Sequence, residues 1–386
     1  MEGTGGSGLK DRRVRSACPA FAESDIARIL KDIRRILSTG RLILGPYLQR
    51  FEEEFASYVG VKHAAGLSSC TAALEATLRY LKVAGGEVVV PTNTFVASAN
   101  AVIYAGATPV FCDIDKTSLA LDVQDLERRL TRKTRAVIVV HIAGTISPAI
   151  WDIKRLCDSK RIPLVEDAAH AHGAMIDGCK AGALGMAGCF SMYPTKVMTT
   201  AGGGMVTTND PGLARFCSAV RHHGAGAEGL SVPECQGNDW IMDEMSAAVG
   251  RRQLARLDRF LASRNQRATL YREQIEHVPG LSNLPISSNR RNSHYKYIVL
   301  LDNKRVNVQR ILTTASSVHN VELAQLYFPP CHLQPIFRSR RRVRLPNAED
   351  VLPRAIALPM HPKLSRKDVT RVVGVLQTLC PGAGRT

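Results

Sequence analysis

Residues 163–196 read PLVEDAAHAHGAMIDGCKAGALGMAGCFSMYPTK and contain two short apolar runs, 163–165 and 188–191. The first run is followed by the acid pair 166–167, and the second leads to Lys196. Apolar runs of this length, bounded by turn residues and alternating with helical patterns, are typical of an α/β layer with a largely parallel sheet. The stretch therefore predicts two strands with polar groups at their carboxyl ends.

The same alternation extends from about residue 20 to residue 257. Apolar residues at helical spacing alternate with apolar runs of strand length. The expected helices include 25–37, 47–59 and 72–83, and the expected strands include 87–90, 108–111, 136–140, 163–165, 188–191 and 204–207.

The pattern of apolar and polar residues changes after this region. A long amphipathic pattern at 242–275 predicts helices that link two domains. The 386 residues also exceed the size at which a single core stops growing. We expect a large domain at 18–257 with a mostly parallel central sheet, then linking helices and a smaller C-terminal α+β domain at 258–386. The later segments predict a strand at 294–301, a helix at 308–318, a loop at 328–344 and a helix at 366–379.

Composition is that of an ordinary folded protein. Hydrophobic residues make up 45% and charged residues 22%, and the apolar runs are far shorter than a membrane helix requires. Residues 1–17 begin MEGTGGSGLKDRR and lack the apolar stretch of a signal peptide, so we expect a flexible tail. The ten cysteines form no CxxC pair, which favours reduced thiols and a cytoplasmic location.

The net charge of +17 would suit a nucleic acid, a membrane surface or a polyanionic small molecule such as a nucleotide sugar. Only 5% of the residues are aromatic, whereas RNA-binding sheets interleave aromatic with basic residues, and the chain has no recognisable nucleic-acid-binding module. We therefore expect a small-molecule partner, with no nucleic acid and no membrane.

The segment 66–74, GLSSCTAAL, places small hydroxylated residues just before an expected helix. Free backbone amides and the positive end of the helix dipole form an anion site at such a position, and Ser and Thr hydroxyls add donors. An ordinary Ser/Thr N-cap would explain the same pattern without a ligand.

Asp167 directly follows the apolar run 163–165. A carboxylate at the carboxyl end of a parallel strand faces the ligand crevice, where it could keep a pyridine nitrogen protonated. A salt bridge or a helix cap would explain an isolated Asp equally well. Of the two histidines that follow, His170 shares the face of the site, and we expect a structural role for His172.

Lys196 follows the apolar run 188–191 and precedes a glycine run, 202–204. A lysine amine in a pocket can attack an aldehyde to form an imine, although most lysines are solvated surface charges. The order of the three elements is more specific than any of them alone, because a site for pyridoxal 5'-phosphate (PLP) requires a phosphate cradle, an acid for the pyridine nitrogen and an amine.

The chain resembles the DegT/DnrJ/EryC1/StrS family of PLP-dependent sugar aminotransferases, which have the aspartate aminotransferase fold (PLP-transferase fold type I). The resemblance covers nearly the whole length. The matching segments are 45–46 with 51–55, 68–74, 91–95 and 106–115, 140–144, 166–173, 190–196 and 330–335.

The resemblance implies a role for individual residues. Lys196 would hold PLP as a Schiff base, Asp167 would pair with the pyridine nitrogen, and Phe95 would stack on the ring. His170 would lie near the ring and its phenolic oxygen. The phosphate ligands would be Ser69, Cys70, Thr71 and Ser191. The resemblance also implies a homodimer with shared active sites, and transfer of an amino group from glutamate or glutamine to a keto sugar, in amino sugar, antibiotic or polysaccharide biosynthesis.

Two segments depart from the family pattern. The run Ala201-Gly-Gly-Gly-Met205 lacks the Glu that relatives usually carry. In 237–242, Asp239 stands where Asn is usual and Ile241 where Arg is usual. Relatives use this segment to reach the phosphate pocket of the partner subunit, and Asn238 is the candidate substitute here.

Other readings follow from these departures and from the family's range. A weakened PLP-binding homologue with a regulatory or binding role is one alternative, and an aminotransferase that acts on a cyclitol ketone is another. PLP-dependent sugar dehydratases replace the lysine with histidine, so Lys196 argues against them.

Three further features have open interpretations. His222 and His223 resemble a metal pair, but no third ligand has suitable spacing, so we expect no metal site. The arginine-rich run 338–344 is either a solvated loop or a contact for a substrate diphosphate. His332 either contacts sugar hydroxyls or braces the proline loop.

Overall fold

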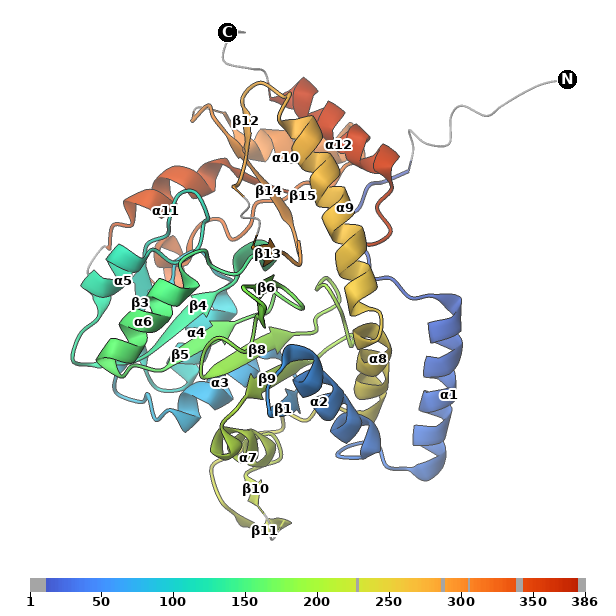
Figure 1. The fold of residues 1–386 in the computed structure, drawn as a ribbon, viewed down its shortest axis with the longest axis vertical. Coiled ribbons are helices and arrows are strands. Elements are labelled where there is room, and N and C mark those ends of the chain that lie inside the picture. The colour runs from blue at the N-terminus through green and yellow to red at the C-terminus, as the bar shows by residue number, and fades with distance from the viewer. Residues whose placement is uncertain (1–11, 227–228, 286–288, 305, 338–342, 381–386) are drawn as a thin grey trace, which may run out of the picture.

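The computed structural model describes residues 12–226, 229–285, 289–304, 306–337 and 343–380 (Figure 1). A seven-stranded sheet with the strand order β1-β9-β8-β5-β4-β2-β3 forms its centre. The strands are β1 His63–Leu67, β2 Glu87–Pro91, β3 Thr108–Cys112, β4 Thr134–Val140, β5 Leu164–Asp167, β8 Ala187–Ser191 and β9 Gly204–Thr208.

The sheet confirms the predicted α/β class with a mostly parallel sheet. Strands β3, β2, β4, β5 and β8 pair in parallel, whereas β9 is antiparallel to both β8 and β1. All six expected strands are present, but β1 has no counterpart in the sequence analysis. Its residues, HAAGL, include none of the β-branched or aromatic types that mark a strand, and pairing with β9 determines their conformation.

Helices cover both faces of this sheet, and each face has its own apolar core. One core includes Leu74 of α3 and Val102 of α4, and the other includes Phe51 of α2 and Ile153 of α6. These helices and their neighbours are α1 Glu23–Thr39, α2 Pro46–Val59, α3 Cys70–Tyr80, α4 Val96–Tyr104, α5 Val123–Arg129, α6 Ile150–Lys160 and α7 Pro211–Val220.

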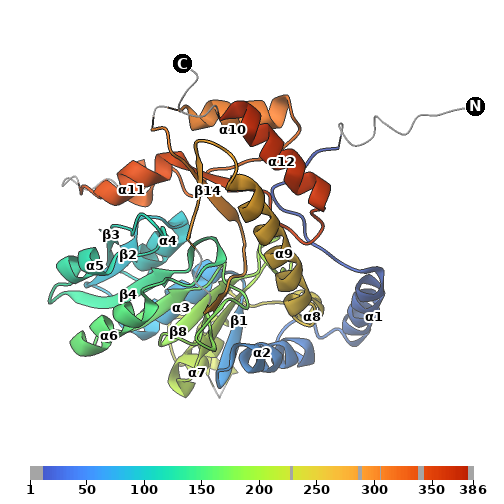
Figure 2. The ribbon, with the colours of Figure 1, turned by 45° about the horizontal axis from the view of Figure 1, so that its top comes forward.

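The expected linking region consists of two helices, α8 Glu244–Leu254 and α9 Leu257–Ile275. Helix α9 runs from the large sheet towards the C-terminal part of the chain (Figure 2). Its first turns add Leu257 and Leu261 to a core of the large sheet, whereas Tyr271 and Ile275 belong to a separate C-terminal core. One helix therefore fixes the two cores relative to each other.

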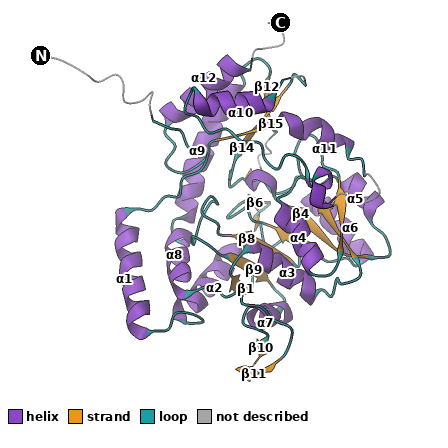
Figure 3. Ribbon diagram, turned by 180° about the vertical axis from the view of Figure 1, so that it is seen from behind, coloured by secondary structure: helices purple, strands orange, loops and turns teal. Residues whose placement is uncertain are grey.

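The C-terminal core lies between a small antiparallel sheet and helices, as expected for an α+β unit (Figure 3). Its elements are β12 Leu281–Asn283, β14 Tyr297–Leu301, β15 Ala355–Leu358, α10 Val308–Ser317 and α12 Arg366–Leu379. The expected loop at 328–344 contains single 3₁₀ turns at Cys331–Leu333 and Pro335–Phe337, and residues 338–342 lie outside the described residues.

Short pieces complete the fold. Strands β6 Met175–Ile176, β7 Cys179–Lys180 and β13 Arg290–Arg291 form a small sheet, and β10 Ala225–Gly226 pairs with β11 Gly229–Pro233. No helix in the described part of the chain is long and apolar enough to cross a membrane.

Residues 12–17, in the expected tail, pack against the C-terminal unit. Val14 is 2% exposed and forms a parallel bridge with Val321. The carbonyl oxygen of Ser16 accepts hydrogen bonds from the backbone N–H of Met360 and from Nζ of Lys296. The described part of the tail is thus held in place by both apolar and polar contacts.

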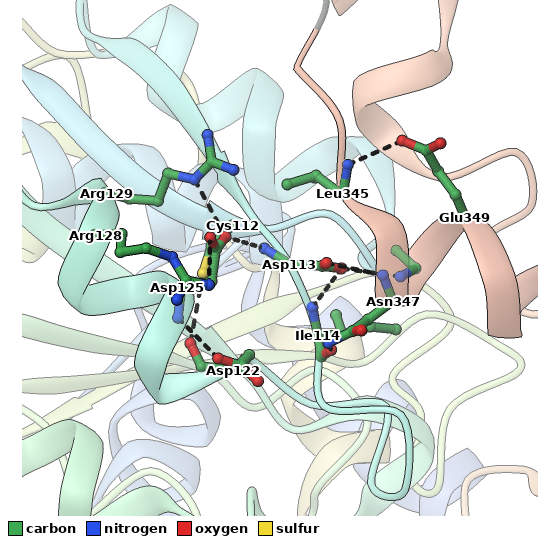
Figure 4. Close-up of polar contacts among 11 residues, drawn as sticks. Cys112, Asp113, Ile114, Asp122, Asp125, Arg128, Arg129, Leu345, Asn347 and Glu349 are labelled. Atoms are coloured by element: carbon green, nitrogen blue, oxygen red, sulfur yellow. Dashed lines mark hydrogen bonds and ion pairs between the residues drawn. The ribbon is translucent and has the colours of Figure 1, made fainter.

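A polar cluster joins the edge of the large sheet to α11, Pro346–Val351 (Figure 4). The Asp113 carboxylate, at the end of β3, accepts hydrogen bonds of 2.9 Å from the backbone N–H groups of Asn347 and Ala348. Asp125 in turn accepts a hydrogen bond of 2.7 Å from the Asp113 backbone. Free amides at a helix start need such acceptors, so Asp113 fixes where α11 begins.

Glu244 performs the same function for α2 from inside the core. Its carboxylate is 0% exposed and accepts hydrogen bonds from the backbone N–H groups of Gly45, Tyr47 and Leu48, at 3.1, 2.9 and 2.9 Å. The first turn of α2 is therefore tied to the first residue of α8.

We predict that Glu244→Ala lowers the free energy of unfolding by about 2 to 4 kcal/mol, because three amides lose their charged acceptor in a buried place. Chemical denaturation followed by circular dichroism measures the loss. The control is Glu54→Gln, which weakens a half-exposed ion pair with Arg251 in the same region and should cost less than about 1 kcal/mol. Equal losses in the two variants would contradict the capping role.

Candidate active site

A cavity of about 470 Å³ lies at the carboxyl ends of β5 and β8. This size suits a small organic ligand. Its lining includes every residue predicted for the site except Asn238, namely Ser69, Cys70, Thr71, Phe95, Asp167, His170, Ser191 and Lys196. The fold thus gathers residues from four separate segments of the sequence.

The first wall of the cavity is the start of α3. Ser69 is the N-cap, and its Oγ accepts a hydrogen bond of 3.1 Å from the backbone N–H of Ala72. Cys70 and Thr71 are the first helical residues, so their amides lie at the positive end of the helix dipole. Burial raises the pKa of the Cys70 thiol well above its ordinary value, which keeps it neutral beside a bound anion. The N-cap expected at 66–74 is therefore present, and the anion site expected there stays a prediction.

The glycine run 202–204 lies opposite the start of α3. Ser69 forms a parallel bridge with Gly203, and a Cβ placed on Gly204 would lie 2.2 Å from the carbonyl carbon of Ser69. Only glycine permits this approach of the two backbones. Ala201 has a φ of 71°, so the residue before the run adopts a left-handed conformation that non-glycine residues seldom take.

Asp167 and Glu166 end β5 and face opposite sides of the sheet, because successive strand side chains alternate. Glu166 is 0% exposed and accepts hydrogen bonds from the backbone amides of Gly182, Leu184 and Gly185, in addition to contacting Nε2 of His141. Glu166 is consequently fully occupied in holding the turn before β8.

Asp167 lines the cavity. Its Oδ2 accepts a hydrogen bond of 2.7 Å from the Ser98 hydroxyl, and its Oδ1 accepts one of 3.1 Å from the backbone N–H of Ala169. Two neutral donors fix the orientation of the carboxylate, and no ion pair to it occurs among the described residues. The carboxylate can thus pair with a cationic group of a ligand.

Lys196 lies in the turn that follows β8. Its backbone N–H donates a 2.9 Å hydrogen bond to the Tyr193 carbonyl. Its Nζ lies 4.7 Å from the ring centroid of Tyr295. Tyr295 and Tyr327 both line the cavity, although the sequence analysis assigned neither to the site. Both belong to the C-terminal part of the chain, so no local motif pointed to them.

His170 lies against these tyrosines. Its ring stacks on Tyr295 with a centroid distance of 4.1 Å, and its Nε2 is 2.7 Å from the Tyr327 hydroxyl. Burial lowers the pKa of His170 well below its ordinary value, and the charge of Lys196 contributes in the same direction. The imidazole is therefore neutral at physiological pH. Its Nδ1 is buried and has no hydrogen-bond partner among the described residues.

His172 is 0% exposed and lies outside the cavity lining, with its ring 5.2 Å from that of Phe190. Burial lowers its pKa to about 3. The placement agrees with the structural role expected from the sequence.

His332 braces the loop of the C-terminal part. Its Nδ1 is 2.7 Å from the Thr92 hydroxyl, and its Nε2 is 3.3 Å from Glu349. Both ring nitrogens are thus occupied by groups of the chain itself. Of the arginine-rich run, residues 338–342 lie outside the described residues.

The segment 237–242 lies beside the residues that precede α3. The Trp240 carbonyl accepts a 2.7 Å hydrogen bond from the backbone of Ser68, and Ile241 forms an antiparallel bridge with Leu67. Asn238 and Asp239 are exposed and do not line the cavity of their own chain. His222 pairs with Asp239 through the backbone, and no cluster of three or more metal-ligating side chains occurs among the described residues.

Comparison with known proteins agrees with this geometry. The model of the DegT/DnrJ/EryC1/StrS aminotransferase family matches residues 23–377. A UDP-N-acetyl-3-dehydro-alpha-D-glucosamine 3-aminotransferase of Acidithiobacillus ferrooxidans is 34% identical over 357 residues, covering 92% of this chain and 94% of the relative. A dTDP-3-amino-3,4,6-trideoxy-alpha-D-glucose transaminase of Streptomyces venezuelae is 34% identical over 361 residues, covering 92% of each.

A solved structure is similar over the same extent. The crystal structure of S. venezuelae DesV in complex with a ketimine intermediate superposes with a TM-score of 0.86 at 32% identity, covering 93% of this chain and 96% of the other. The fold and site define a PLP-dependent aminotransferase with the aspartate aminotransferase fold. The chain belongs to the DegT/DnrJ/EryC1/StrS aminotransferase family.

The residues present fit PLP. The amides at the start of α3, with the glycine backbone opposite, would hold the phosphate, and the Asp167 carboxylate, which lines the cavity, would pair with a protonated ring nitrogen. The unpartnered Nδ1 of His170 is a buried polar atom of the kind that a bound ligand satisfies. Cofactor and cavity therefore agree in charge as well as in size.

We predict that Gly204→Ala raises the dissociation constant of PLP about 5- to 100-fold, because the new methyl group displaces Ser69 and overpacking of this kind costs about 1 to 3 kcal/mol. Titration of the apoprotein with PLP, followed by absorbance, measures the change. Gly374→Ala in α12 is the control, since a Cβ there meets nothing within 4 Å and the residue lies outside the cavity lining, so PLP binding should stay unchanged. Similar losses in both variants would contradict the role of the close approach.

Proposed function

We propose that this protein transfers an amino group from glutamate or glutamine to a keto sugar, most simply one linked to a nucleotide, and that Lys196 holds PLP as a Schiff base. The observation that carries the proposal is the convergence of Lys196, Asp167 and the start of α3 on one cavity. The relatives named above act on UDP- and dTDP-linked sugars. A net charge of +17 favours anionic substrates of this kind.

Each residue would act through a defined atom. When bound, PLP supplies an electron sink for the carbon that loses its proton. Asp167 would hold a proton on the ring nitrogen, and Phe95, which lines the cavity and is 55% exposed, would pack on the ring. Nζ of Lys196, after release by the incoming amine, would take up the proton from the substrate carbon that bears the nitrogen.

The remaining roles concern binding. Ser69, Cys70, Thr71 and the Ser191 hydroxyl would hold the phosphate, and His170 would contact the phenolic oxygen. Tyr295 and Tyr327 cover the cavity from the C-terminal side and would exclude water around the Lys196 amine.

We further propose a cytoplasmic homodimer with shared active sites. Asn238 supports it, because this residue is exposed, lies outside its own cavity and belongs to a segment that is hydrogen-bonded to Ser68 through Trp240. In a dimer, the same segment would complete the phosphate site of the neighbour.

We predict that protein loaded with pyridoxamine phosphate loses the pyridoxamine spectrum when the correct keto sugar is added, and that Lys196→Ala abolishes both this reaction and the visible band of the PLP form. Borohydride reduction of the PLP form should attach the cofactor to the peptide that contains Lys196, as measured by mass spectrometry. The control is Lys62→Ala, a lysine outside the cavity. A colourless protein that binds no PLP would contradict the proposal.

A shared site also predicts complementation between two inactive or impaired variants. Lys196→Ala lacks the amine but keeps the 237–242 segment, whereas Asn238→Ala keeps the amine. After mixing and subunit exchange, one of the two sites in a mixed dimer is intact, so activity should exceed the sum of the separate variants. A strictly additive mixture, with exchange verified by mass spectrometry, would argue against sharing through Asn238.

A further inference from the structure

The hydrogen bond between Tyr327 and His170 connects two parts of the chain that are 157 residues apart. Tyr327 lies in a loop whose two ends are fixed. At one end, Ala324 pairs with Ala357 of β15, and at the other, the backbone N–H of Cys331 donates a 3.1 Å hydrogen bond to the Thr92 carbonyl. The loop thus crosses from the small sheet to the turn that carries Phe95.

The backbone of Tyr327 has a φ of 55°, which is unusual for a bulky residue. Such conformations persist where the surrounding contacts require them, and they are frequent at functional sites. Here the contacts are the Tyr327 hydroxyl on His170 and the Tyr327 ring, whose centroid is 5.8 Å from that of Phe95. The tyrosine is therefore held between the histidine and the aromatic wall of the cavity.

The hydrogen-bonding capacity of His170 decides what this contact does. A neutral imidazole has one N–H donor and one acceptor nitrogen. If the Tyr327 hydroxyl donates to Nε2, the proton of His170 must be on Nδ1, which is the nitrogen without a partner in the chain. No other acceptor for this hydroxyl occurs among the described contacts of Tyr327, and a phenol is the stronger donor of the two groups.

We propose that Tyr327 is a positioning residue that fixes the tautomer of His170, so that Nδ1–H of His170 points as a donor to an anionic oxygen of the bound ligand. This inference rests on the proposed placement of His170 beside the phenolic oxygen of PLP. Tyr295 has a different role, because its ring stacks on His170 while its hydroxyl is 3.3 Å from Thr195. Tyr295 fixes the plane of the imidazole by stacking, and Tyr327 determines which ring nitrogen carries the proton.

The charged and titratable groups around this pair are compatible with two neutral partners. Lys196, His172 and Lys296 face His170 and lower its pKa, in addition to the larger effect of burial. Burial raises the pKa of Tyr327 well above its ordinary value, and Tyr295, Asp167, Cys70 and Cys331 act in the same direction. Neither His170 nor Tyr327 therefore changes charge at neutral pH, so the tautomer persists while the ligand titrates.

The test is a spectrophotometric pH titration of the PLP-loaded protein. A hydrogen bond donated to the phenolic oxygen stabilises its anionic form, so Tyr327→Phe should raise the midpoint of the visible absorption change by roughly 0.5 to 1 pH unit. It should also weaken PLP binding about threefold to tenfold. Tyr271→Phe is the control, because it removes a buried tyrosine hydroxyl that donates to the Pro359 carbonyl outside the cavity and should leave the midpoint in place.

A double-mutant cycle separates positioning from a general structural effect. In a His170→Phe background, Tyr327→Phe should cause no further shift of the midpoint, because the partner of the hydroxyl is already absent. Equal shifts in the parent and in this background would overturn the inference, as would an unchanged midpoint in Tyr327→Phe. If the parent protein shows no visible band with PLP, the proposed function and this inference fail together, whereas a normal band that Tyr327→Phe leaves unaltered removes only the inference.

Discussion

The acid pair at the end of β5 is the constraint on which the site depends. Strand geometry directs Glu166 and Asp167 to opposite sides, and the protein uses the two carboxylates differently. Glu166 accepts three backbone hydrogen bonds and a contact from His141, which is how a fully buried carboxylate is stabilised. It thereby fixes residues 182–185, which lead directly into β8, and Lys196 lies in the turn that follows β8. Moving Glu166 would therefore move the amine relative to Asp167.

The second constraint is the close contact between two backbones. Gly203 and Gly204 lie against Ser69, and no side chain separates the two backbones. The strand β1 that leads to Ser69 is held by β9, which begins at Gly204. The same pairing therefore forms the edge of the sheet and places Ser69 beside the glycine run, and it explains why a segment such as HAAGL is ordered as a strand.

The C-terminal part of the chain completes the cavity. Tyr295 precedes β14, and Tyr327 lies in the loop before Cys331, so both depend on how the small sheet is placed. Helix α9, the Asp113 contact with α11 and the His332 contacts with Thr92 and Glu349 fix that placement. The surroundings of His170 therefore depend on how the C-terminal part is positioned against the large sheet.

The sequence by itself determined the α/β class and the six strands with patterned apolar runs, because these features are encoded locally, and its resemblance to the family pointed to the residues that line the cavity. Asp167 ends its strand, Lys196 comes one short turn after its strand, and the residues around Ser69 begin a helix, so strand and helix ends pointed to them. Tertiary structure alone decided the rest. Strand β1 depends on its partner β9, Tyr295 and Tyr327 reach the cavity across more than a hundred residues, and the loop around His332 is set by contacts with Thr92 and Glu349. These features result from packing between segments that are distant in the sequence. The residue pattern of one segment does not show which other segments will contact it in the folded chain.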